Sequence, residues 1–163
     1  MYKSEFETML KRIQYYSEHT KCETYFTITG DFLVDDVTSI IKLQPFNSWN
    51  KGDKRTAENG EYTFSRWSYG LCDNYDVETS NMVNLTLIDL FDKKEELNMI
   101  KEKYADVYFG LVIIPTVRHD ESTPTLSLSM EAMKWCVETG TNIDIDLYVS
   151  CPEGDIDDYT LNI

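Results

Sequence analysis

The residues of this chain that are best suited to contact a ligand or a partner occur in two short segments. They are Trp49, Lys51, Asp53, Trp67 and Ser68. Two indoles beside a cation, an anion and a hydroxyl combine the apolar walls and polar groups that are typical of a ligand pocket. A turn at Gly52 would fold the first segment back towards the second, so we expect both indoles and both charged groups to lie on one face of the domain. The sequence also allows a second interpretation, in which the indoles are buried for packing and Gly52 only supplies a positive φ to the turn.

A second candidate site is the pair Asp144 and Asp146, two residues apart in a segment with strand-like alternation. Such side chains point to the same face of a strand, and paired carboxylates can bind a metal ion or exchange protons. Alternating acids are also typical of the solvent face of an edge strand, which is the interpretation we favour. The acidic run at Asp155, Asp157 and Asp158 lacks the glycine and the terminal glutamate of a calcium loop. We therefore predict no metal site.

The sequence contains none of the short motifs that mark common catalytic or nucleotide-binding sites. No serine lies in Gly-x-Ser-x-Gly, and the glycine-rich phosphate-binding loops are absent. The only histidines are His19 and His119, and the polar run around His119 is expected to be exposed. We therefore identify no catalytic residue and expect no cofactor, and we favour a role that is not enzymatic.

The chain is strongly acidic, with 29 acidic against 15 basic residues and a formal net charge of −14. Binding to the phosphate backbone of a nucleic acid depends on clustered lysine and arginine, so this charge argues against nucleic acid as a partner. The charge is compatible with a basic protein partner, because complementary potentials speed association. Solubility alone would also explain it.

Several features predict a cytoplasmic protein that does not enter a membrane. No apolar run approaches the roughly 20 residues that span a bilayer, and the N-terminus lacks the apolar core and cleavage site of a signal peptide. The four cysteines are widely scattered: Cys22, Cys72, Cys136 and Cys151. In a chain without an export signal we expect them to be free thiols.

Hydrophobic periodicity divides the chain into three parts. Residues 1–20 carry apolar side chains at the spacing of one helical face, namely Phe6, Met9, Leu10, Ile13 and Tyr16. We expect this helix to pack on the domain. Residues 21–152 are expected to form one domain, and residues 153–163 are expected to form an acidic, loosely held tail.

Within the domain, strand-like and helix-like patterns alternate. Strands are expected at residues 24–29, 61–69, 107–115 and 143–149, and a helix is expected at 130–139, between Ser129 as N-cap and Gly140 as C-terminal residue. In the last strand, the isoleucines, Leu147 and Val149 are expected to be buried. The order predicts an α+β fold with an antiparallel or mixed sheet and helices on one face. We favour a ferredoxin-like arrangement, which a divergent duplication could have produced.

Five motifs occur in the same order and at similar spacing in a known family. They are Thr27 to Phe32, Trp49 to Asp53, Trp67-Ser68, Leu126 to Glu131 and Asp144 to Tyr148. Over roughly residues 23–150 the chain resembles the bacterial family called domain of unknown function 4279. The resemblance implies a small bacterial cytoplasmic protein, and it supplies no established catalytic residue.

Two functional hypotheses follow from the sequence. The favoured one is a non-enzymatic acidic binding module with a basic protein partner, such as an antagonist or immunity-type protein. The alternative is a small-ligand binder or enzyme that uses the region of Trp49, Asp53 and Trp67. The sequence does not specify an oligomeric state.

Overall fold

The computed structural model describes residues 19–55, 60–74, 78–118 and 120–150. The helix predicted for residues 1–20 therefore lies outside the described residues, except for His19 and Thr20. The predicted tail at residues 153–163 and the exposed position predicted for His119 also lie outside them.

Six strands and four helices form the described part of the chain. The strands are β1 (Lys21–Gly30), β2 (Asn47–Trp49), β3 (Ser65–Asn74), β4 (Tyr108–Arg118), β5 (Asn142–Ile145) and β6 (Tyr148–Ser150). The helices are α2 (Val34–Ile41), α3 (Thr79–Leu87), α4 (Lys94–Lys103) and α5 (Met130–Thr139). The strand predicted at 24–29 lies within β1, the strand predicted at 107–115 corresponds to β4, which begins one residue later, and the predicted helix at 130–139 is α5.

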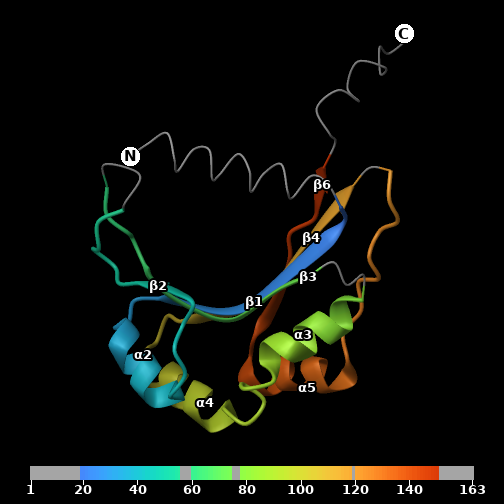
Figure 1. Ribbon diagram of the computed structural model, residues 1–163. Helices are drawn as coiled ribbons and strands as arrows, with labels where there is room; N and C mark the ends of the chain where they lie inside the picture. The colour runs from blue at the N-terminus through green and yellow to red at the C-terminus, as the bar shows by residue number, and fades with distance from the viewer. Residues whose placement is uncertain (1–18, 56–59, 75–77, 119, 151–163) are drawn as a thin grey trace.

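The strands form one mixed sheet in the order β2-β3-β1-β4-β5, with β6 also paired to β4. The β2–β3, β3–β1 and β1–β4 pairs are antiparallel, whereas β5 and β6 run parallel to β4. The described helices all lie on one face of this bent sheet, below it in Figure 1. The fold is therefore α+β with a mixed sheet, as predicted. The ferredoxin-like arrangement and the duplication are not confirmed.

The core lies between the sheet and the helices, and the alternation along β1 shows how the sequence produces it. Cys22, Phe26 and Ile28 are fully buried on the helix side, because every second side chain of a strand points to the same face. Phe26 meets the ring of Trp135 from α5 edge to face, at 5.6 Å between ring centroids. Burying each such large side chain contributes about 1.5–3 kcal/mol to folding.

Helix α5 is positioned by the terminal residues that the sequence predicted. The Ser129 hydroxyl accepts a hydrogen bond from the backbone N–H of Ala132 at 3.1 Å. At the other end, Gly140 has a left-handed φ of 59°, and its N–H reaches the carbonyls of Cys136 and Val137. Both predictions are confirmed.

The strand predicted at residues 143–149 is present as β5 and β6, but the burial of its apolar side chains was predicted wrongly. Ile143 and Ile145 pair in parallel register with the buried residues Leu111 and Ile113 of β4. Ile145 is nevertheless 49% exposed and Val149 is 66% exposed. They lie on the outermost strand of the sheet, where the described helices leave them uncovered.

Two further observations concern the predicted compartment. Cys22 and Cys136 are free thiols, as predicted, and Cys72 is not in a disulfide bond, while Cys151 lies outside the described residues. No helix in the described ranges is both long enough and apolar enough to span a membrane.

Candidate functional site

The two tryptophans expected to lie on one face are placed on opposite faces of the sheet. Trp67 points to the helix side, where it is fully buried and its indole N–H donates to the Thr38 hydroxyl of α2 at 3.1 Å. Trp49 pairs with Arg66, the neighbour of Trp67, and neighbours on a strand face opposite ways. The prediction that both indoles converge is therefore wrong. Trp49 pairs with Arg66 and not with Trp67, and a shift of one residue in the pairing changes the face to which a side chain points.

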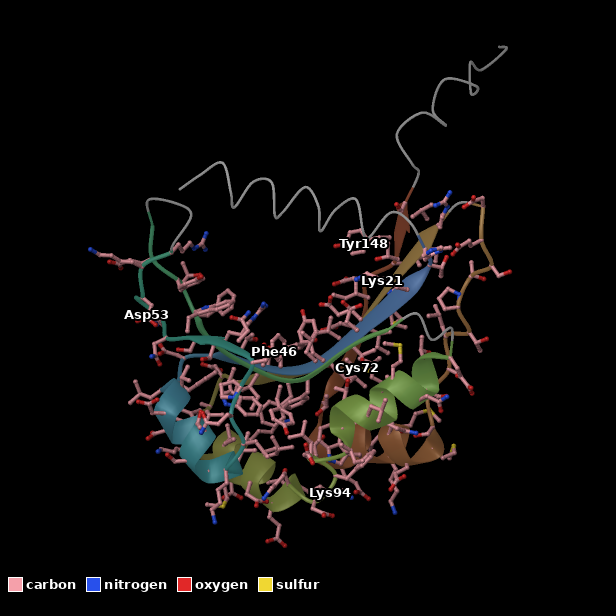
Figure 2. The ribbon with its side chains drawn as sticks, viewed as in Figure 1. Lys21, Phe46, Asp53, Cys72, Lys94 and Tyr148 are labelled. Atoms are coloured by element: carbon pink, nitrogen blue, oxygen red, sulfur yellow. The ribbon has the colours of Figure 1, made fainter. Side chains whose placement is uncertain are left out.

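Lys51 and Asp53 lie in the turn between β2 and β3, and their contacts shape that turn. The Asp53 carboxylate accepts the backbone N–H of Asn50 at 2.7 Å, while the Lys51 ammonium pairs with the Asp31 carboxylate. Gly52 between them has φ 88°, as the packing interpretation expected. Figure 2 shows Asp53 beyond the end of β2, away from the centre of the sheet. These contacts support a structural role for both charged residues.

The face of the sheet opposite the described helices, which we call the open face, carries a hollow of about 440 Å³. Its polar and aromatic lining comes from β1, β3, β4 and the β5 region: Tyr25, Thr27, Thr29, Arg66, Tyr108, Asp144 and Asp146. Ser68 lies at the buried base of the same face, and its hydroxyl is 3.0 Å from that of Thr27. Phe46, visible above the sheet in Figure 2, meets the Tyr25 ring edge to face at 5.9 Å. Of the predicted site residues, Trp49 and Ser68 therefore belong to the open face.

Aromatic rings hold the side chain of Arg66 on this face. Its guanidinium carbon lies 4.9 Å from the ring centre of Trp49 and 5.9 Å from that of Phe64. Trp49 is fixed in turn, because it stacks on Tyr62 at 4.3 Å and donates its indole N–H to the Phe64 carbonyl at 3.0 Å. The Nε atom of Arg66 is buried and has no hydrogen-bond partner among the described residues. An unpaired donor of this kind favours an acceptor that arrives with a ligand.

A tyrosine–aspartate pair lies on the opposite side of the hollow. The Tyr108 hydroxyl donates to Oδ2 of Asp144 at 2.7 Å, and burial, followed by this carboxylate, raises the pKa of Tyr108 to about 12. Gly110 makes room for the pair, because a Cβ there would lie 3.0 Å from the Tyr108 ring and 3.1 Å from Oδ2 of Asp144. Burial also raises the pKa of Tyr25, against the opposing effect of the Arg66 charge. Both phenols therefore keep their protons near neutral pH and act as hydrogen-bond donors or cation-binding rings rather than as bases.

Asp144 and Asp146 lie in the same hollow as Arg66 but form no ion pair with it. No lysine, arginine or histidine in the described ranges forms an ion pair with either carboxylate. Among these same residues, no group of three or more histidine, cysteine, aspartate or glutamate side chains could hold a metal ion. A cation supplied by a partner can satisfy this charge.

Sequence reasoning missed Tyr25, Arg66 and Tyr108. One signal could have found the first, because β1 alternates core residues with Glu23, Tyr25, Thr27 and Thr29, a mixture of polar and aromatic residues that does not suit a second core. No comparable signal identifies Arg66. Its aromatic support includes Trp49, which the β2–β3 pairing brings beside it.

The family described as Domain of unknown function (DUF4279) matches residues 20–150, a range that includes every described strand and helix and the whole open face. No curated protein and no solved structure matches the chain. The chain therefore belongs to the DUF4279 family.

Proposed function

We propose that this domain is a non-catalytic binding module that binds a basic protein partner through the acidic side of its open face. The observation that carries the proposal is the pair Asp144 and Asp146, unpaired with any described cation and next to the exposed rings of Tyr108 and Tyr148. Lysine and arginine side chains are attracted both to carboxylates and to the faces of aromatic rings. The two kinds of group together favour a partner that presents such side chains.

The charge of the whole chain supports the same partner. A net charge of −14 attracts a basic surface over about a Debye length, roughly 8 Å at physiological salt, and speeds association. The raised pKa values of Tyr25 and Tyr108 keep both phenols protonated, so that both rings remain neutral and can contact a cation. Binding of this kind suits an antagonist that blocks a basic protein.

A peptide with alternating lysine and valine tests the proposal on the full chain. We expect a capped nonapeptide of this pattern to bind, measured by isothermal titration calorimetry. The double variant Asp144→Asn with Asp146→Asn is expected to weaken binding about tenfold, the equivalent of about 1.4 kcal/mol. Asp35→Asn with Glu95→Gln is the matched control, because it removes the same charge from exposed positions on α2 and α4. Equal weakening by both double variants would show that only net charge matters and would contradict the proposal.

One observation favours a second candidate function, the binding of a small anionic ligand. The Arg66 guanidinium is held against Trp49 at the edge of the 440 Å³ hollow, and no residue that the structure describes pairs with its Nε. Succinate and inorganic phosphate are suitable probes, and quenching or enhancement of Trp49 fluorescence is the readout. Arg66→Gln should abolish a response to either anion, whereas a wild-type protein that responds to neither would exclude this function.

A further inference from the structure

The outer edge of the sheet at β5 and β6 is an interaction surface of its own. In the described part of the chain, both strands pair with β4 on one side, and neither pairs with a strand on the other. Both strands are short, and the edge is apolar, because Ile145, Leu147 and Val149 are 49%, 57% and 66% exposed. An exposed, apolar edge strand is a template for pairing with another chain.

The direction of the backbone N–H and C=O groups shows which residues of this edge can form hydrogen bonds with an added strand. The N–H of Asp146 donates to the Ile113 carbonyl of β4 at 2.9 Å, so the backbone groups of Asp146 point inward. The backbone polar groups of successive strand residues point to opposite edges. Those of Ile143 and Ile145 are therefore directed outward, where an added strand would find them.

The two faces of the edge differ in chemistry. Asp144 and Tyr148 are in register with Val112 and Thr116 and lie on the open face, whereas Ile143 and Val149 lie on the helix side. A strand added here would place alternate side chains beside the acidic residues and beside the aliphatic ones. A segment in which basic and apolar residues alternate matches both faces.

Charge disfavours two alternative occupants of this edge, a second copy of the chain and the chain's own C-terminal residues. In a symmetric pairing of two copies of this edge, Asp144 and Asp146 of one copy would lie near the same acids of the other, and opposed like charges destabilise a strand pair. The C-terminal residues of the chain, with Asp155, Asp157 and Asp158, have the same unfavourable charge. A basic segment of another protein has the opposite, favourable charge.

We propose that the β5–β6 edge binds an extended segment of a basic protein by strand addition, with alternate basic and apolar side chains on the two faces of the extended sheet. This mode gives affinity through backbone hydrogen bonds and specificity through the alternate side chains. It rests on the proposed function, because it takes the same basic partner and specifies how that partner binds.

Two N-methylated forms of the lysine–valine nonapeptide test strand addition on the full chain. One form carries a methyl group on every lysine nitrogen of the backbone, and the other carries one on every valine nitrogen. An added strand directs only every second amide towards β5. One form should therefore bind about as well as the parent peptide, and the other should bind at least about tenfold more weakly. Loss on valine methylation indicates antiparallel addition, because valines opposite the isoleucines would donate the bonds, and loss on lysine methylation indicates parallel addition.

Amide hydrogen exchange supplies a second measurement. The outward amides of Ile143 and Ile145 should become protected in the complex with the parent peptide, while those of the inward-facing residues change little. Equal binding by all three peptides, without new protection, would overturn strand addition and leave the proposed function in place. Failure of all three peptides to bind would overturn the proposed function as well.

Discussion

The two faces of the same sheet differ in what their alternate residues do. On the covered face, β1 contributes Cys22, Phe26 and Ile28 to a core that the helices close. On the open face, the same strand contributes Tyr25 and Thr29 to a polar hollow, which no described helix covers. The first face determines whether the chain folds. The second face carries groups with unmet charge and hydrogen-bonding capacity, which is why we place the function there.

Two neighbouring residues of β3 show the same difference between the covered face and the open face. Trp67 and Arg66 are neighbours on β3, yet one is closed in by α2 and the other lies on the ring of Trp49 across the sheet. A change on the covered face should therefore act on stability, whereas a change on the open face should act mainly on binding.

The largest expected effect is that of Trp67→Ala. Removing a fully buried indole leaves a cavity and deprives the Thr38 hydroxyl of its partner, so we expect a loss of about 3–5 kcal/mol in the free energy of unfolding. Trp49→Ala on the open face is the matched control and should cost about half as much, because that indole is only partly buried. Urea denaturation of both variants measures the difference. Equal losses would mean that the two faces do not differ in the way described.

The sequence predicted the strands better than it predicted their surroundings. The alternation in β1 and the apolar run in β4 identified both central strands, because period and composition are local properties. In β4, however, Phe109, Leu111 and Val112 are all apolar, so the pattern does not show which side the helices cover. The same limit explains the error at the edge, where Ile145 and Val149 have the alternation of a half-buried strand but none of the described helices lies over them.

The candidate site was predictable only in part, because tertiary pairing creates it. The segment around Gly52 was correctly predicted to form a turn in which this glycine has a positive φ. The grouping of Trp49 with Trp67 failed, since sequence does not show which register a three-residue strand such as β2 adopts. The importance of Arg66 is evident only once that register is known, because the register places Trp49 beside it.

Two glycines extend the comparison with a smaller expected effect. Gly70 on β3 has φ 71°, and a Cβ there would overlap the Thr86 carbonyl oxygen of α3. Gly70→Ala should therefore destabilise by about 2 kcal/mol or more, through backbone strain and displacement of the helix. Gly52→Ala, with φ 88° and open space around it, should cost only the strain, about 1 kcal/mol. Thermal melts would contradict this order if Gly52→Ala proved the more damaging change.

A still smaller effect is expected at the turn between β2 and β3. Asp53→Ala removes the carboxylate that accepts the Asn50 N–H, and should cost about 0.5–1.5 kcal/mol. Asp106→Ala is the control, because Asp106 is also exposed and its carboxylate forms no hydrogen bond within the described residues. If Asp53→Ala leaves the melting temperature unchanged but weakens peptide binding, Asp53 belongs to a binding site rather than to the turn.

The smallest expected effect concerns two tyrosines that have the same kind of partner on opposite faces. Tyr69 on the covered face donates to Asp89 at 2.7 Å, and burial followed by this carboxylate raises its pKa to about 12. Tyr108 on the open face has the same pKa through burial and Asp144. Asp144→Asn should lower the pKa of Tyr108 without returning it to the ordinary value of 10.0, because burial is the larger cause, and it should leave that of Tyr69 unchanged.

Asp89→Asn should have the reverse effect, and NMR titration of ring-labelled tyrosine distinguishes the two phenols. Since both folded-state pKa values lie above the unfolded value, the stability they contribute is complete below about pH 10 and is lost as the pH rises towards about 12. Each variant should therefore lose less stability than the parent protein as the pH rises from about 10 to about 12, because the pKa of its tyrosine lies closer to the unfolded value. If the pKa of Tyr108 does not respond to Asp144→Asn, the Asp144 carboxylate does not accept a hydrogen bond from this phenol in the dissolved protein. The Tyr108–Asp144 pair would then not line the hollow on the open face as described.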